Sequence, residues 1–173
     1  SVVRYGNVMG SRGSVIPFFL EKAKQGVLPI TDKFMTRFNI TLSHAVEMVI
    51  WSIENTYGGE ILVPKIPSYK ITDVAEAIGP NCKKEIIGIR AGEKIHEEMI
   101  TTNDSQSTID IGNYYAILPS DKSIHSFYDK IGIKYNEVEE NFSYNSGSNK
   151  RFLDIEELRS LIIKNIDPEF LPI

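Results

Sequence analysis

The chain has 173 residues, a length that fits one domain or a domain with a small subdomain. Its net charge is −4 and its 19 Lys and Arg residues are scattered, so no basic surface indicates a nucleic-acid partner. No apolar run approaches the ~20 residues that a membrane span needs. The lone Cys82 excludes an internal disulfide, and the three dispersed histidines predict no metal site. A single free cysteine suits a reducing compartment, so we expect a cytoplasmic protein.

Strand and helix patterns alternate along the chain. It opens on a strand with apolar residues at Val2, Val3 and Tyr5, followed by a glycine-rich turn. A helix follows, which Ser14 can cap and Gly26 ends. Further along, we expect strands at 28–30, 35–40, 60–63, 84–89 and 114–118, and helices that begin at residue 41 or 43, at residue 72 and at residue 155. This order predicts an α/β fold in which the small strands form a separate cap.

Other stretches carry more specific expectations. Residues 101–112 are polar and predict a mobile loop, and residues 132–150 are irregular. In the helix that ends at residue 58, apolar residues recur at helical spacing, namely Ala45, Val46, Val49, Ile50 and Ile53. The last helix is expected to bury Leu158, Leu161 and Ile162.

The opening strand also predicts something about the whole chain. A continuous apolar strand normally has neighbours on both sides within a sheet. We therefore expect this chain to be the second half of a larger α/β protein, with an exposed apolar edge between Val2 and Val8.

Motifs that would place catalysis or a dinucleotide in this chain are missing from the sequence. Gly6, Gly10 and Gly13 have a similar spacing to a dinucleotide-binding loop, but no acidic residue follows on the next strand. No Tyr-x-x-x-Lys occurs. We therefore assign no catalytic residue and no cofactor-binding residue to this chain.

Arginines lie where predicted strands end. Arg37 lies in a strand, and Arg90 ends one just before Gly92 and Glu93. The planar guanidinium suits bidentate contact with phosphate, and a carboxylate can accept from sugar hydroxyls. The pair Arg90 and Glu93 could thus hold a nucleotide, and the alternative is a surface ion pair.

Several segments occur in one order: 4–8 (RYGNV), 10–17 (GSRGSVIP), 30–32 (ITD), 35–38 (MTRF), 58–61 (GGEI), 63–68 (VPKIPS), 87–97 (IGIRAGEKIHE) and 142–149 (FSYNSGSN). Together they resemble the C-terminal half of the inverting UDP-N-acetylglucosamine 4,6-dehydratases of the extended short-chain dehydrogenase/reductase superfamily. One departure is Ala91, where the family usually has proline. The resemblance assigns residues 1–100 to the C-terminal part of a Rossmann-type sheet with the UDP-sugar subdomain, and residues 101–173 to a family-specific extension.

The resemblance also implies roles for individual residues. The implied substrate-binding set is Asn7 near the phosphates or sugar, Val15 at the helix start beneath the nucleotide, Ile30 and Thr31 beside the uracil, Arg37 and Arg90 clamping the diphosphate, and Glu93 accepting from the ribose. His96 is expected to have a packed or hydrogen-bonded structural role. Arg12 and Lys94 receive no assignment.

The resemblance further implies an NADP cofactor, bound mainly by a glycine-rich half outside this sequence. In the family, a hydride leaves C4 of the sugar, water leaves across C5 and C6, and C5 inverts, in bacterial surface polysaccharide and pseudaminic acid synthesis. The parent enzyme is expected to be a homo-oligomer. Two alternatives stay open: a UDP-sugar-binding module that acts alone or pairs with a separate N-terminal chain, and a dehydratase/epimerase of capsule synthesis.

Overall fold

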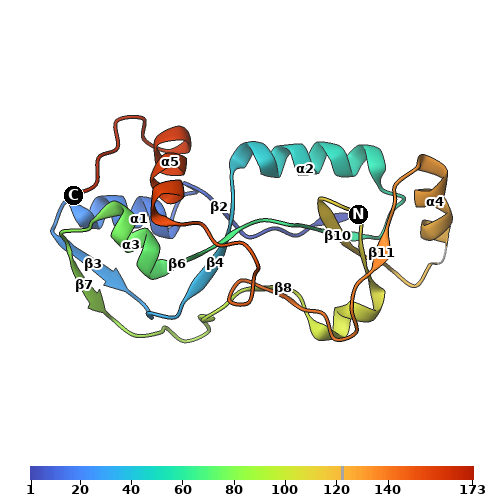
Figure 1. Cartoon of the computed structure of the whole chain (residues 1–173), viewed down its shortest axis with the longest axis horizontal. Coiled ribbons are helices and arrows are strands. Elements are labelled where there is room, and N and C mark those ends of the chain that lie inside the picture. Colours follow the sequence, from blue (N-terminus) through green and yellow to red (C-terminus); the bar gives the residue numbers. More distant parts are fainter. Residues whose placement is uncertain (122) are drawn as a thin grey trace. The chain divides into compact units, whose positions relative to one another are not determined.

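The computed structural model describes residues 1–121 and 123–173. The chain divides into two compact units, each assembled from segments that are distant in sequence (Figure 1). Unit 1 comprises Ser1–Tyr5, Ser43–Lys65 and Glu98–Asn145, and unit 2 comprises Gly6–Leu42, Ile66–Glu97 and Ser146–Ile173. The expected division at residue 100 separates family segments rather than compact units, and it stays a prediction.

Unit 1 is built on a five-stranded sheet in the order β1-β5-β10-β9-β11. The bounds of these strands are β1 Val2–Val3, β5 Ile61–Pro64, β9 Thr108–Asp110, β10 Tyr114–Ile117 and β11 Asn136–Glu137. β1 runs parallel to β5, and the other pairings are antiparallel. A second pairing joins β8 (Glu98–Ile100) to β12 (Tyr144–Asn145).

The opening strand lies at the edge of this sheet. β1 is only two residues long and pairs with β5 alone, and Val2 is 58% exposed. The expected apolar edge is therefore present at Val2.

Helix α2 (Leu42–Asn55) packs against the rest of unit 1, and its apolar spacing does not identify the face that packs. Its buried residues are Ala45, Met48 and Ser52, and the Trp51 ring lies 4.7 Å from that of Tyr114 on β10. The other residues whose spacing predicts the helix are exposed: Val46, Val49, Ile50 and Ile53. The helix was predicted correctly, but two apolar stripes run along it and spacing cannot say which one packs.

The polar stretch after residue 100 is more ordered than we expected. A 3₁₀ helix spans Thr102–Ser107, and β9 follows it directly. The side chains of Thr101 and Asp104 form a reciprocal capping box at its start. The loop prediction was wrong because polar composition masked this cap. The sequence analysis also assigned no element to α4 (Ser123–Ile131), whose Ile124 and Tyr128 are buried in unit 1.

Unit 2 contains two small sheets and three helices. The strands are β2 Asn7–Val8, β3 Val27–Ile30, β4 Thr36–Ile40, β6 Ser68–Lys70 and β7 Lys83–Ile86, and the helices are α1 Val15–Ala23, α3 Ile71–Ile78 and α5 Ile155–Asn165. β2 pairs in parallel with β4, β4 pairs antiparallel with β6, and β3 pairs in parallel with β7. Together with the pairing of β1 and β5, these parallel strands confirm the α/β prediction.

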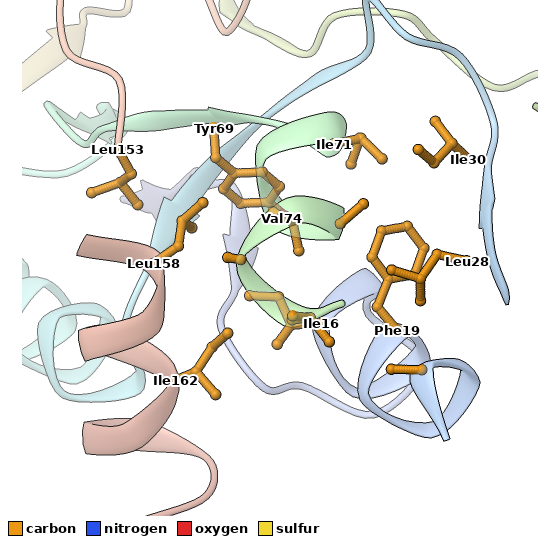
Figure 2. Packing of buried hydrophobic residues seen from close by; sticks show 14 of the residues in the cluster. Ile16, Phe19, Leu28, Ile30, Tyr69, Ile71, Val74, Leu153, Leu158 and Ile162 are labelled. Carbon is orange, nitrogen blue, oxygen red and sulfur yellow. The ribbon is translucent and has the colours of Figure 1, made fainter. Parts of the chain in front are cut away.

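The core of unit 2 joins α1, α3, α5 and β3 (Figure 2). Ile16 and Phe19 of α1 pack with Leu28 of β3, while Leu158 and Ile162 of α5 face Val74 of α3 in Figure 2. The expected burial of the last helix is confirmed for Leu158 and Ile162, and Leu161 is partly buried. A reciprocal capping box between Asp154 and Glu157 begins α5.

Candidate functional site

A hollow of about 270 Å³ opens in unit 2. It is bordered by β2, the first turn of α1, the end of β3, β4, β6 and the loop after β7. The residues of the implied substrate-binding set that line it are Asn7, Val15, Thr31, Arg37, Arg90 and Glu93. Segments more than 80 residues apart in sequence thus meet around one hollow.

Ile30 is the member of that set that does not line the hollow. Its side chain belongs to the buried core of unit 2, beside Leu28 on β3. Its backbone oxygen accepts the N–H of Ile87, at 2.9 Å. Its side chain is therefore not free to border a base, whereas Thr31, the next residue, lines the hollow.

Strand register explains why the binding side chains converge. β4 pairs with β6 so that Arg37 lies opposite Tyr69, and β2 pairs with β4 so that Asn7 lies opposite Asn39. Residues two apart on a strand, such as Arg37 and Asn39, share a face of the sheet. Asn7, Arg37 and Tyr69 therefore point to the same side, where all three line the hollow.

The start of α1 supplies a second set of polar groups. Ser14 precedes the helix in an extended conformation, and it lines the hollow together with Val15. The Ser14 hydroxyl is buried and makes no hydrogen bond with any described residue, so it does not cap the helix. The N–H groups of a first helical turn have no intrahelical acceptor and carry partial positive charge, which makes this end attractive to an anion.

Arg37 is held from two directions. Its Nη1 donates to the backbone oxygens of Thr36 and Ile95, at 2.7 and 3.1 Å, and its Nε lies 3.6 Å from Oε1 of Glu97. The side chain is only 13% exposed. A guanidinium fixed in this way is a preorganised contact for an anion, because little side-chain freedom remains to be lost on binding.

Arg90 and Glu93 lie on the loop after β7 and do not form the surface ion pair that was the alternative. The Glu93 carboxylate instead accepts the backbone N–H of Arg90 at 3.2 Å, and no described carboxylate lies within ion-pairing distance of the Arg90 guanidinium. Gly92 between them has a φ of +82°, which side chains rarely adopt. The turn therefore brings Arg90 and Glu93 to one hollow as separate polar groups.

A buried network of hydroxyls lies behind Arg37. The Thr36 hydroxyl contacts His96 Nδ1 at 2.8 Å and the Ser146 hydroxyl at 2.7 Å. A Cβ at Gly147 would lie 2.6 Å from His96 Nδ1, so the chain packs closely on the imidazole. His96 therefore has the hydrogen-bonded structural role that we expected.

Sequence reasoning gave no role to Glu97 or Tyr69, and it expected Ser14 to cap the helix, which it does not. Burial raises the pKa of Glu97, and Arg37, the Phe38 N–H and Lys94 counter only part of this rise. Burial and the nearby Glu97 also raise the pKa of Tyr69, which is neutral at physiological pH. The signal that could have identified Glu97 is its place beside Arg90 and Glu93 in a segment that matches the resembled family.

Comparisons with known proteins identify the family to which this chain belongs. A family model described as polysaccharide biosynthesis protein matches residues 1–119. UDP-N-acetylglucosamine 4,6-dehydratase (inverting) of Campylobacter jejuni strain 81-176 is 50% identical over 94% of this chain and 50% of its own length. UDP-glucose 4-epimerase of Rickettsia canadensis is 36% identical over 94% of this chain and 48% of its own.

The crystal structure of Pen from Bacillus thuringiensis superposes with a TM-score of 0.76 at 32% identity, over 94% of this chain and 49% of that one. The chain therefore spans about half the length of the curated relatives and of the structure that it matches. Among the described residues, no helix is both long and apolar enough to cross a bilayer.

Proposed function

Because the chain belongs to the polysaccharide biosynthesis protein family, we propose that the hollow of unit 2 binds the UDP part of a nucleotide sugar. The observation that carries this proposal is the convergence of Arg37 and Arg90 with the first turn of α1 around one hollow. Two guanidinium groups and a helix N-terminus match the charge of a diphosphate. An anion of this kind would also give the Ser14 hydroxyl the partner that the described residues do not supply.

The other lining residues fit the remainder of the nucleotide. Glu93 is an acceptor for the ribose hydroxyls, since its carboxylate keeps acceptor capacity beyond its one bond to the Arg90 N–H. Phe18, Pro29 and Ile87 line the hollow as apolar groups beside Thr31, which suits the face of a uracil ring.

We further propose that this site serves 4,6-dehydration of UDP-N-acetylglucosamine with inversion at C5. This substrate and reaction are named for the Campylobacter relatives, which are 50% identical to this chain. Within a homo-oligomeric cytoplasmic enzyme of polysaccharide synthesis, this chain's residues would bind and orient the UDP group. The implied substrate-binding set includes no residue assigned as general acid or base, so no chemical step is assigned to it.

The nicotinamide cofactor that the resemblance implies does not fit the residues present. The segment between β2 and α1 contains Gly10 and Gly13, but its helix end faces the hollow that Arg37 and Arg90 share. No Tyr-x-x-x-Lys occurs in the sequence. We therefore derive no hydride-transfer step from this chain, and NADP remains a proposal for the whole enzyme.

The second candidate is the UDP-sugar-binding module without catalysis that the sequence analysis leaves open. Calorimetric titration of UDP into the purified 173-residue chain tests the binding that both candidates share. We expect saturable binding that Arg90→Ala weakens strongly. The control is Lys24→Ala, which removes the same charge at the far end of α1 and should bind like the parent chain. A folded chain that does not bind UDP, or equal binding by Arg90→Ala, would remove the hollow as the UDP site.

Product analysis separates the two candidates. The chain is supplied with a separately expressed N-terminal half of the Campylobacter relative, NADP and UDP-N-acetylglucosamine. Formation of the 4-keto-6-deoxy sugar, lost with Arg90→Ala, supports the dehydratase. UDP binding without product supports the binding module.

A further inference from the structure

Glu97 is the carboxylate that directly faces two residues of the proposed diphosphate site. Its Oε1 lies 3.6 Å from Nε of Arg37. The side-chain nitrogen of Asn7, in the amide orientation that satisfies it, donates to both Glu97 oxygens at 3.0 and 2.9 Å. The backbone N–H of Phe38 donates to Oε2 at 3.4 Å. One carboxylate thus receives donors from β2 and β4.

The backbone of Glu97 is fixed, so the carboxylate cannot easily leave this position. The backbone N–H of Glu97 donates to the Ser146 hydroxyl at 2.9 Å, and the backbone N–H of Ser146 donates to the backbone oxygen of Glu97 at 2.8 Å. Ser146 is completely buried. This reciprocal pair fastens the segment before β8 to the segment before α5.

Arg37 does not depend on Glu97 for its position. Its Nη1 is held by two backbone oxygens, as described above, and Nη2 has no partner among the described residues. Removing the Glu97 charge would therefore leave the guanidinium in place. What Glu97 changes is the charge that an incoming anion meets at Arg37.

We propose that Glu97 is the internal counter-ion of Arg37 and that it takes up a proton when a diphosphate binds there. This inference rests on the proposed function of the hollow. In the ligand-free site, the carboxylate neutralises the guanidinium. A diphosphate on the same guanidinium places two anions beside one cation in partly desolvated surroundings, which favours the neutral carboxylic acid. The proton comes from bulk solvent, and the protonated group keeps an oxygen that can accept from Asn7.

The surroundings of Glu97 support this exchange. Its side chain is 31% exposed, so a proton can reach it from solvent. The titratable and charged groups that act on it are Arg37 on β4, Tyr69 on β6 and Lys94 on its own segment. The neighbouring His96 imidazole contacts the Thr36 hydroxyl instead. Burial already raises the pKa of Glu97, with Arg37, the Phe38 N–H and Lys94 as the opposing influences. An anion that competes for Arg37 removes part of that opposition.

The sign of the pH dependence follows from proton uptake. The pKa of Glu97 should be higher in the complex than in the free chain. Affinity should therefore rise as pH falls between these two pKa values, and it should stay constant below the lower one. Each unit by which the ligand raises this pKa corresponds to about tenfold in affinity. Glu97→Gln imitates the neutral acid, so it should bind about tenfold more tightly than the parent chain at pH 8 and lack this tightening.

The probe is UDP-N-acetylglucosamine, because each of its phosphates is a diester that does not titrate in this range. Calorimetry at several pH values between 5 and 8, in two buffers of different ionisation enthalpy at each, counts the protons taken up. We expect uptake by the parent chain and none by Glu97→Gln. Glu98→Gln removes the same charge from the next residue, which is exposed, and should behave like the parent chain. All other ionisable groups are the same in the parent chain and in Glu97→Gln, so the difference between the two isolates Glu97.

Three results would overturn the inference. They are weaker binding by Glu97→Gln, the same pH dependence in both chains, and no proton uptake by the parent chain. The last result needs no substitution, so the test survives if Glu97→Gln does not fold. If the folded parent chain binds neither UDP nor the UDP-sugar at any pH, the proposed function fails together with this inference.

Discussion

Arg37→Ala should separate the contribution of Arg37 to folding from its contribution to binding. The substitution removes the cation beside Glu97. Burial already raises the pKa of this carboxyl group. The backbone oxygens of Thr36 and Ile95 keep other donors, the Ser146 hydroxyl and the Thr36 N–H, so the lost hydrogen bonds to them cost little. The main cost is a half-buried carboxylate without its cation, for which we expect a loss of about 1–3 kcal/mol in unfolding free energy at neutral pH.

The sign of its pH dependence is fixed by the direction of the pKa shift. A carboxylate whose pKa is raised in the folded chain lowers stability while it is charged. This cost disappears as pH falls toward the pKa that the group has in the unfolded chain. The destabilisation by Arg37→Ala should therefore shrink between about pH 7 and about pH 4.5. Urea denaturation followed by circular dichroism measures it at each pH.

A second substitution completes the test. Adding Glu97→Gln to Arg37→Ala removes the uncompensated charge, so it should restore most of the lost stability. It should not restore UDP binding, which we expect to fall by about 2–4 kcal/mol when the guanidinium is lost. The same destabilisation at every pH, or no rescue by Glu97→Gln, would refute the reasoning about this ion pair.

The remaining predictions concern groups that the ion pair does not include. Ser14→Ala should change unfolding free energy by less than about 0.5 kcal/mol, because its hydroxyl makes no cap hydrogen bond, yet it should weaken UDP binding measurably in calorimetry. Unchanged UDP affinity would exclude a contact with Ser14. Glu60→Gln should destabilise the chain by about 2–3 kcal/mol in urea at pH 7, because the buried carboxylate accepts the N–H groups of Tyr57 and Gly58, at 2.8 Å each. Burial opposes these bonds, but the net pKa of Glu60 is lowered, so its contribution is present above the unfolded pKa and is lost as pH falls through the folded one. An equal loss of stability by Glu60→Gln at acidic and neutral pH would contradict this assignment.

Much of the site could be predicted from local sequence. Arg90 and Glu93 are recognisable because they end a strand pattern and flank Gly92, and the resembled segments supply Asn7, Arg37 and Thr31. Glu97 was not predictable in its role, because its contacts depend on the register that brings β2 and β4 together. The resemblance placed Ile30 beside the uracil together with Thr31, whereas alternation along β3 turns the Ile30 side chain into the core.

Many elements of the fold were likewise predictable from local sequence patterns, and their packing was not. Local apolar periodicity predicted α1, α3 and α5 to within a few residues, although Ser14 does not cap α1 and Thr72 lies inside α3. The packing face of α2 was not predictable, because Val46 and Ile53 are as apolar as Met48, and only Met48 meets a partner in the core of unit 1. The short strand β9 was missed because a strand of three residues has too little alternation to detect.

The hollow of unit 2 draws its walls from two separate stretches of chain, Gly6–Leu42 and Ile66–Glu97, and a third stretch, Ser146–Ile173, is bonded behind them through the Ser146 hydroxyl. No one of these stretches holds the binding groups in position by itself, so the site exists only while the whole unit is folded. A bound nucleotide consequently stabilises all three against separation by RT ln(1 + [L]/Kd), which amounts to about 2.7 kcal/mol at a hundredfold excess over Kd. Nucleotide occupancy would thereby protect distant peptide bonds from proteolysis and hydrogen exchange, including those of α5, which does not line the hollow.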